Sequence, residues 1–224
     1  MVSASAEDRI RTAAFDLFAS RGFDQTTVDD IAASAGVGRT TFFRKFRSKE
    51  DAIFPTHDEL LAVLSDRLAA VDADDCRHAV LDAARVVFAH YLDEGARARQ
   101  RYELTRTVAA LQVRELVGTQ EYFHLFRNTL RERSNSDEFG AALRDEQYAS
   151  AVVTAHNYVL RRWLRGDTQR AQAWAELEQS FDEVRAQHDS RAEGSPELTT
   201  VVVVTGTADP DSVAARVRSA LLPG

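Results

Sequence analysis

Five cationic side chains lie close together near the N-terminal end of the 224-residue chain. The segment 38–49 contains no acid, and its cations are Arg39, Arg44, Lys45, Arg47 and Lys49. Guanidinium and ammonium groups neutralise phosphates, and an arginine can also donate two hydrogen bonds to the edge of a guanine. Because a basic cluster is more often only a solvated surface, its meaning depends on the elements that carry it.

A short helix is predicted directly before the cluster. Thr27 precedes Val28, and Asp30 stands three residues after Thr27, which is the spacing of a capping box. Gly36 follows the apolar positions of this helix and can take the left-handed backbone conformation that ends a helix at little steric cost. The helix is therefore expected to begin at Val28 and to end at about Ala35.

A second short helix is predicted from about Arg39, because Phe42 and Phe46 lie four residues apart on one face. Two short helices joined by a tight glycine turn are typical of a helix-turn-helix, whose second helix enters the DNA major groove. An earlier helix over 6–20 is expected to complete a three-helix domain over residues 6–54. Ser48, with an acid three residues later, predicts one more helix start in this domain.

The charge balance is consistent with a confined nucleic-acid surface. Through Phe54 the chain has eight basic and eight acidic residues, whereas the remainder has twenty and twenty-seven and therefore carries the whole net charge of −7. An acidic body discourages wrapping by nucleic acid, so binding is expected at the N-terminal patch alone.

Membrane, secreted and enzymatic classes are disfavoured. No apolar run approaches the roughly twenty residues that span a bilayer, the N-terminus lacks a signal-peptide pattern, and the single Cys76 fits a reducing cytosol. We therefore expect a cytoplasmic protein without contact to a membrane. The six histidines form no recognised metal spacing and no nucleophile or phosphate-loop motif is present, so neither enzymatic activity nor a cofactor is expected.

The rest of the chain predicts an all-α body over residues 56–187. Leucines at helical spacing after Pro55 indicate a connector helix to about Val71, and further helices are expected over about 76–94, 119–133, 137–165 and 168–187. The segment 97–117 fits one bent helix or two short ones. The apolar stripe of the helix over 137–165 includes Phe139 and Leu143, which we therefore expect to be buried.

The tail, residues 188–224, departs from the helical pattern. Residues 188–197 are predicted to form a linker, Leu198 to Thr205 are rich in β-branched residues that favour a strand, and Pro210 opens a short terminal helix. Two hypotheses remain open. The strand pairs with its equivalent in a second subunit, or the tail is disordered.

The segment from Ile10 to Phe54 resembles the DNA-binding domain of TetR-type (TetR/AcrR) transcriptional regulators. The matching stretches are AAFDLFASRGFDQTTVDDIAASAGV and TTFFRKFRSKEDAIF, which together cover about a fifth of the chain. The resemblance implies a homodimer with one helix-turn-helix per subunit, a palindromic operator in double-stranded DNA, and a C-terminal helical domain that mediates dimerisation and senses a ligand.

The chain departs from this family pattern around its second short helix. Gly38 stands where members usually have a serine cap, and Phe43 stands where many have a tyrosine that contacts a phosphate. Arg44 and Lys45 follow where histidine is common. Phosphate contact is therefore expected to shift from tyrosine to these two cations.

We expect the DNA contacts at the start of the second helix, in its next turn, and at two other helix starts, where backbone amides suit a phosphate oxygen. The residues at the start of the second helix are Arg39, Thr40 and Thr41, and those in its next turn are Phe43, Arg44 and Lys45. Thr27 and Lys49 are the residues at the two other helix starts. Arg39 is expected to specify sequence, because two hydrogen bonds to guanine discriminate by about 1–3 kcal/mol.

An effector pocket is expected between the helices of the body. The candidate residues are Phe88, Tyr91, Tyr102, Arg106, Phe123, Phe126, Tyr148 and Asn157. Aromatic residues at helical spacing more often form simple core, and Arg106 is either an anchor for an anionic group or a solvated arginine. Some TetR-type proteins with a similar recognition region respond to fatty acyl-CoA esters, so the resemblance implies a small hydrophobic, acyl-CoA-like effector.

These expectations combine into a dimeric repressor that a ligand releases from its operator. The alternative is a DNA-binding regulator without a small-molecule effector, controlled by a protein partner or by its abundance.

Overall fold

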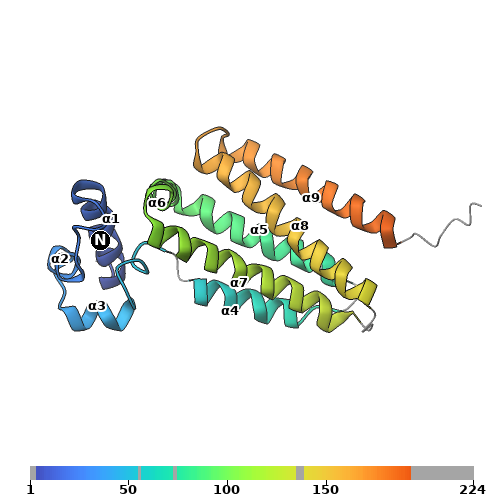
Figure 1. Ribbon diagram of the computed structural model, residues 1–224, viewed down its shortest axis with the longest axis horizontal. Helices are drawn as coiled ribbons and strands as arrows, with labels where there is room; N and C mark the ends of the chain where they lie inside the picture. Colours follow the sequence, from blue (N-terminus) through green and yellow to red (C-terminus); the bar gives the residue numbers. More distant parts are fainter. Residues whose placement is uncertain (1–3, 55–56, 73–74, 135–138, 193–224) are drawn as a thin grey trace, which may run out of the picture. The chain divides into compact units, whose positions relative to one another are not determined.

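The computed structural model describes residues 4–54, 57–72, 75–134 and 139–192, and within these ranges the chain is all-α, as predicted, and contains no strand. The described ranges hold nine helices (Figure 1). Their bounds are α1 Ala6–Arg21, α2 Val28–Ser34, α3 Arg39–Lys45, α4 His57–Ala69, α5 Cys76–Glu94, α6 Ala96–Thr107, α7 Ala109–Arg133, α8 Phe139–Leu164 and α9 Arg170–Ala192. None of these helices is long and apolar enough to cross a membrane.

The chain divides after His188 into two compact units, residues 1–188 and 189–224. The predicted linker, strand and terminal helix fall in or directly before the second unit. From residue 193 onward these predictions lie outside the described residues.

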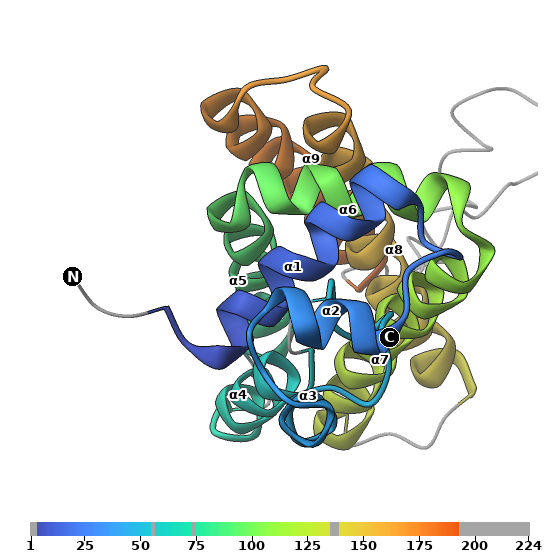
Figure 2. The same ribbon diagram turned by 90° about the vertical axis from the view of Figure 1, so that its left-hand side faces the viewer.

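The three helices α1, α2 and α3 form the predicted N-terminal domain around one apolar core (Figure 2). Its members include Ile10 and Phe18 of α1, Ile31 of α2, and the predicted pair Phe42 and Phe46, all of them buried. The Phe42 and Phe46 ring centroids lie 5.6 Å apart. Burial of Phe42 fixes which face of α3 turns inward, and so which face remains available to a partner.

The start of α2 and its glycine turn form as predicted. The Thr27 hydroxyl accepts a hydrogen bond from the Asp30 amide at 3.1 Å, and the Asp30 carboxylate accepts one from the Thr27 amide at 2.9 Å. The hydrogen bonds from Thr27 lower the pKa of the Asp30 carboxyl. Gly36 has φ +65°, and the amide of Val37 then donates to the Ala32 carbonyl at 2.9 Å.

The helix predicted from Ser48 is wrong, because the structure has bends and turns over residues 47–54. The Asp51 amide does donate to the Ser48 hydroxyl at 3.4 Å. However, the Asp51 carboxylate accepts from the Arg47 amide and from the Arg114 side chain, both at 3.2 Å, and residues 52–54 are all buried. Three consecutive buried side chains do not fit one face of a helix.

Helices α4 to α8 and α9 as far as Val184 contribute to a second apolar core, which forms the body. The helix predicted over 76–94 is α5, with the same bounds. The prediction for 97–133 placed a boundary near residue 118, whereas the chain breaks only at Val108, where the backbone is extended. Gly118 lies buried inside α7, where packing offsets a helix-propensity cost of about 1 kcal/mol.

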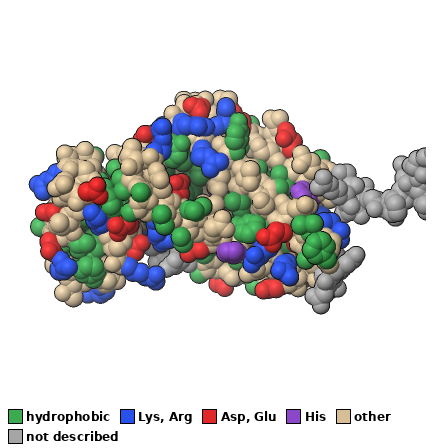
Figure 3. Space-filling view, viewed as in Figure 1, with side chains coloured by type: hydrophobic (Ala, Val, Ile, Leu, Met, Phe, Trp, Pro, Cys, Tyr) green, Lys and Arg blue, Asp and Glu red, His purple; other side chains and the backbone are tan. Residues whose placement is uncertain are grey.

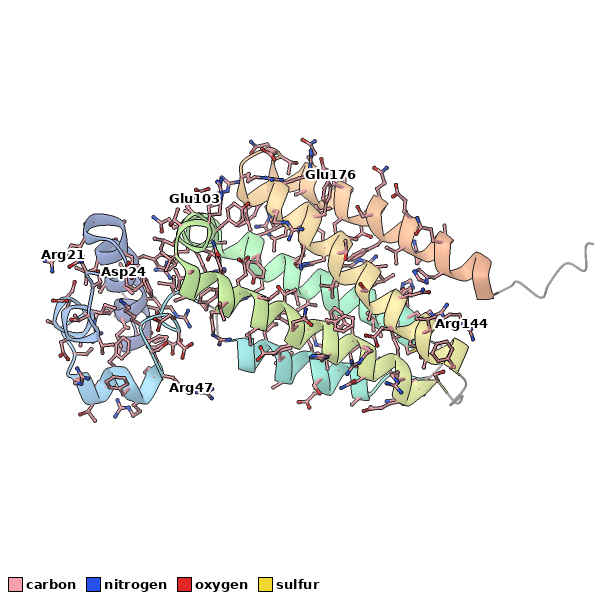
Figure 4. All side chains as sticks on the ribbon, in the orientation of Figure 1. Arg21, Asp24, Arg47, Glu103, Arg144 and Glu176 are labelled. Atoms are coloured by element: carbon pink, nitrogen blue, oxygen red, sulfur yellow. The ribbon has the colours of Figure 1, made fainter. Side chains whose placement is uncertain are left out.

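A tight reversal at Gly166, with φ +84°, joins α8 to α9 as predicted. Arg162 on α8 pairs with Glu176 on α9 at 3.0 Å, and Figure 4 shows Glu176 at the contact between the two helices. Arg85 on α5 pairs with Glu178 at 2.7 Å. These pairs hold α9 against its two neighbours.

The predicted burial of Phe139 and Leu143 at the start of α8 is wrong. Their side chains are 82 % and 44 % exposed. A helical stripe predicts which residues share a face, but a neighbouring element must also cover that face before they are buried.

Candidate functional site

The outward face of α3 carries the predicted basic residues. Arg39, Thr40, Arg44 and Lys45 are exposed, and Thr41 is half-buried. In the view of Figure 3, Lys and Arg side chains lie along the edge of the domain that α3 forms. The helix starts at Gly38 without a side-chain hydrogen bond at its cap, as the residue type there implies.

Arg39 is held by two neighbours. Its guanidinium pairs with Asp29 of α2 at 2.6 Å and lies 5.1 Å from the ring centroid of Phe43, which is 45 % exposed. An exposed pair of this kind contributes only about 0.2–1 kcal/mol. Exchange of Asp29 for a base edge or a phosphate therefore costs little, while Phe43 keeps the guanidinium oriented at the start of the helix.

Arg44 and Lys45 occupy the last turn of α3. The Lys45 ammonium lies 3.8 Å from the Glu7 carboxylate, and the two side chains are 43 % and 32 % exposed. Arg47 follows directly beyond the helix, where Figure 4 labels it. The three cations extend the positive surface from the start of α3 to its end.

Thr27 and Lys49 are used within the domain. The Thr27 hydroxyl donates to Asp30 at 2.6 Å as part of the cap. The Lys49 ammonium donates to the Phe23 and Thr26 carbonyls at 2.7 and 3.0 Å and lies 4.0 Å from the centroid of the Phe23 ring. Since the helix start expected beside Lys49 does not form, this side chain ties the segment after α3 to the turn before α2.

A cavity of about 30 Å³ lies in the body between α5, α7 and α8. Its lining residues are Ala84, Val87 and Tyr91 of α5, Glu115, Thr119, Tyr122 and Phe126 of α7, Val153, His156 and Asn157 of α8, and Phe54 of the N-terminal domain. Sites for drug-sized ligands occupy roughly 300–1,000 Å³. The cavity must therefore widen before it holds such a ligand.

Five of the eight predicted effector residues lie at or beside this cavity. Tyr91, Phe126 and Asn157 line it. Phe88 packs behind it, with its ring centroid 5.7 Å from that of His156. Phe123 lines an adjoining groove.

The other three predicted effector residues are placed elsewhere. Arg106 is 58 % exposed in its side chain and lies 3.5 Å from Glu103, so it is a solvated arginine, with Tyr102 beside it. The Tyr148 hydroxyl donates to the Arg77 carbonyl at 3.2 Å. None of the three lines the cavity described above.

The polar part of the lining was not predicted from the sequence. Glu115, Thr119, Tyr122 and Phe126 are spaced four, three and four residues apart, which is the signal that places them on one face of α7. His156 stands in the apolar stripe of α8, a pattern that predicts a core position. A buried ionisable residue in such a stripe is the second signal.

The cavity is electrostatically neutral at its histidine. Burial lowers the pKa of His156 to about 4, so the imidazole is uncharged at neutral pH. Its Nδ1 lies 3.1 Å from Asn157 Oδ1, whereas its Nε2 is buried and has no hydrogen-bond partner among the described residues. Burial also raises the pKa of Glu115 and of Tyr122.

A groove of about 330 Å³ between α7 and α8 adjoins the cavity. It is lined by Thr119, Gln120, Phe123, Ser150, Val153, Thr154, Asn157 and Arg161. Three of these residues, Thr119, Val153 and Asn157, also line the cavity. These three residues border both spaces and are called the wall below.

Helix α7 connects the cavity to the N-terminal domain. Leu111, near its start, is fully buried in the core of that domain. Arg114 pairs with Asp51 at 3.2 Å, and the next residue, Glu115, lines the cavity. The same helix therefore contacts the N-terminal domain at Leu111 and Arg114 and lines the cavity from Glu115 onward.

Helix α6 makes a second connection through Arg101, which is 4 % exposed. The Arg101 guanidinium donates to the Ile53 carbonyl at 3.2 Å, pairs with Glu94, and lies 5.3 Å from the ring centroid of the cavity residue Tyr91. Figure 2 shows α6 beside α1. The buried Arg101 therefore contacts both Ile53, at the end of the N-terminal domain, and the cavity residue Tyr91.

An exposed basic helix in a helix-turn-helix, joined to a helical body that contains a cavity, is the arrangement of a DNA-binding domain attached to a second helical domain. Residues 10–53 match the family described as bacterial regulatory proteins, tetR family. This match covers the helix-turn-helix domain, and over that segment the chain is similar to the family's transcriptional regulators. Over 92 residues it is 36 % identical to a protein of Mycobacterium tuberculosis named as the mycofactocin biosynthesis transcriptional regulator MftR. That alignment covers 41 % of this chain and 46 % of the relative, which is about half the relative's length.

Solved structures share the fold. SmeT, the repressor of a multidrug efflux pump of Stenotrophomonas maltophilia, was solved with triclosan, and it matches 91 % of this chain and 100 % of its own with a TM-score of 0.57 and 16 % identity. The fatty acid degradation regulator FadR of Bacillus halodurans matches 82 % of this chain and 96 % of its own, with a TM-score of 0.52 and 18 % identity. At such identities the likeness shows the fold alone.

Proposed function

We propose that the protein is a repressor that binds a palindromic operator as a homodimer and is released when a small hydrophobic effector enters the cavity. The observation that carries the proposal is the position of α7. One end of this helix is buried in the core of the DNA-binding domain, and its next turns line the cavity.

In the operator complex, the start of α3 meets the base edges and its later turns meet the backbone. Arg39, with Thr40 and Thr41 beside it, contacts bases in the major groove, and the ring of Phe43 orients Arg39. Arg44 and Lys45 take the phosphate contacts. The exposed Thr27 at the start of α2 accompanies them, whereas Lys49 is left out because its ammonium is already bound to two carbonyls.

A homodimer is supported by the exposed surface of α8 and α9. These helices form an open groove of about 690 Å³ that is lined mostly by small and polar side chains and includes the exposed Tyr158. Two copies related by a two-fold axis would pair α8 and α9 with their equivalents. Each subunit would then place α3 in one half-site of a palindrome.

Release follows from the connections through α7 and α6. A ligand that widens the cavity pushes on Phe54 and on the α7 face, and the displacement reaches Leu111 and Arg114 beneath the helix-turn-helix. The separation of the two α3 helices in the dimer changes as a result. The effector has to prefer this state over the operator-bound state by a few kcal/mol.

A second candidate is a regulator of the same DNA-binding type without a small effector. The specific observation in its favour is the volume of the cavity, about 30 Å³, which holds no drug-sized molecule in this conformation. Control by a protein partner or by abundance would leave the cavity as a packing defect.

The test of DNA binding begins with selection of duplexes from a randomised pool by the purified full chain. We expect an inverted repeat to be enriched. Arg39→Ala with Arg44→Ala should then abolish specific binding in a gel shift while the dimer persists in sedimentation, because a base contact and a phosphate contact are both lost. Arg67→Ala, an exposed arginine on α4, is the matched control and should bind as the unaltered protein does.

Retained specific binding by the double arginine variant would contradict the assignment of α3 as the reading helix. Enrichment of a sequence without two-fold symmetry would contradict the dimer. The two candidates separate on one further measurement, since only a ligand-responsive repressor releases the selected duplex when a small hydrophobic molecule is added.

A further inference from the structure

His156 leaves one hydrogen-bond acceptor unused at the cavity. The Asn157 side chain presents its carbonyl oxygen to Nδ1 at 3.1 Å, and a carbonyl oxygen only accepts. Nδ1 of the neutral ring therefore carries the proton, and Nε2 is left with a lone pair. Nε2 is buried, has no partner among the described residues, and belongs to a side chain that lines the cavity. A ligand that donates a hydrogen bond would satisfy it.

The charges around the cavity disfavour an anion. The described lining residues include one carboxyl group, Glu115, and no Lys or Arg. Arg101 is nearby, but Glu94 already neutralises it. Arg161 lines only the outer groove. A buried anion without a cation partner is strongly disfavoured, and the rest of the lining is mostly aliphatic and aromatic.

Resting on the proposed function, we propose that the cavity takes uncharged, mainly apolar molecules that carry a hydrogen-bond donor, and that Nε2 of His156 accepts this hydrogen bond. The ligand enters from the groove between α7 and α8 when the wall of Thr119, Val153 and Asn157 opens. The thioester end of an acyl chain has no donor, so this class departs from the acyl-CoA-like effector that the family resemblance implies.

Three probes of nearly equal apolar volume separate the possibilities: 4-tert-butylphenol, its methyl ether, and 4-tert-butylbenzoate. Binding to the full-length protein is measured by titration calorimetry at neutral pH. We expect the phenol to bind roughly tenfold or more tightly than the ether, because a site that offers a buried acceptor rejects an analogue without a donor. The benzoate should not bind measurably.

Two variants assign the preference to His156. His156→Leu keeps the volume of the side chain but removes the acceptor, so the phenol and the ether should bind with nearly equal affinity. His156→Gln keeps an acceptor and should retain the preference for the phenol. Circular dichroism checks that both variants are folded. If His156→Leu does not fold, the phenol-to-ether affinity ratios of the unaltered protein and of His156→Gln are the deciding measurements.

Equal affinity of phenol and ether for the unaltered protein, tightest binding of the benzoate, or an unchanged ratio in His156→Leu would each overturn the inference. Failure of all three probes to bind would overturn it as well. Failure of the proposed function is distinguished by a separate measurement, the binding of the selected operator duplex. A probe that binds as expected but leaves the selected operator duplex bound would contradict release and not the ligand class.

Discussion

Arg101→Met tests whether one buried guanidinium fastens the body to the N-terminal domain. Without Arg101, the Glu94 carboxylate, whose side chain is 19 % exposed, loses its partner, and the Ile53 carbonyl loses its donor. Breaking a buried ion pair from one side costs about 3–5 kcal/mol, and an unsatisfied buried polar group costs about 1–3 kcal/mol. Since water retains some access to Glu94, we expect a total loss of about 3–5 kcal/mol.

The second variant of the cycle, Arg101→Met with Glu94→Gln, removes the uncompensated charge. Only the penalty at Ile53 and the lost packing then remain, so the double variant should be more stable than Arg101→Met alone, with a deficit of about 1–3 kcal/mol. Urea denaturation followed by circular dichroism at one fixed protein concentration measures both. Arg106→Met, an exposed position on the same helix, is the control and should stay within about 0.5 kcal/mol of the unaltered protein.

A loss below about 1 kcal/mol in Arg101→Met would refute this reasoning, because it would mean that solvent screens the pair as it does at a surface. A double variant no more stable than the single one would show that Glu94 is not the source of the cost. Operator affinity, measured with and without a ligand, is an independent test of the role of Arg101. If Arg101 couples the cavity to the DNA-binding domain, Arg101→Met should alter the response to a ligand more than the affinity for DNA measured without one.

Three further variants test individual features. Thr27→Ala removes the hydroxyl of the capping box and should lower the free energy of unfolding by about 1 kcal/mol in urea, and an unchanged midpoint would show that the cap does not contribute. Gly36→Ala should cost about 1–2 kcal/mol because φ is +65°, whereas Gly38→Ala, at φ −78° and with open space around its Cβ position, should cost much less. His156 has a pKa of about 4 in the folded protein against an ordinary 6.5, so the unfolded chain binds a proton at a higher pH than the folded chain does. The contribution of the neutral ring to the free energy of unfolding is fully present above pH 6.5, and this free energy should fall by about 3 kcal/mol as the pH drops to 4. That fall should be smaller in His156→Leu and unchanged in the exposed control His124→Gln, and equal acid sensitivity of both variants would count against the assignment.

Local signals in the sequence were reliable wherever the physical cause was local. The capping box of Thr27 and Asp30, the left-handed Gly36 and the four-residue spacing of Phe42 and Phe46 each depend on residues within one or two turns of helix. These features predicted the helix-turn-helix and the direction in which α3 faces. The arginines of that face were predictable for the same reason, since burial of Phe42 leaves the opposite side to solvent.

Interactions across long sequence separations were not predictable in this way. The helix expected at Ser48 does not form, because Asp51 pairs with Arg114 and residues 52–54 are buried in the core. The lysine expected to contact a phosphate is instead bound to two carbonyls more than twenty residues earlier in the chain. A capping signal describes what a segment can do alone, whereas its surroundings decide which of its hydrogen bonds form.

The sequence by itself determined that the chain is all-α, that a basic helix-turn-helix lies at its N-terminus, and which residues of α3 face outward, because period and capping are properties of contiguous residues. Only the tertiary structure decided where the cavity lies and how it reaches the DNA-binding domain. Phe54, Glu115 and His156 come from three separate segments, and no periodicity relates them. Their meeting depends on how α5, α7 and α8 pack, and Leu111 joins the N-terminal core only because α7 begins against it.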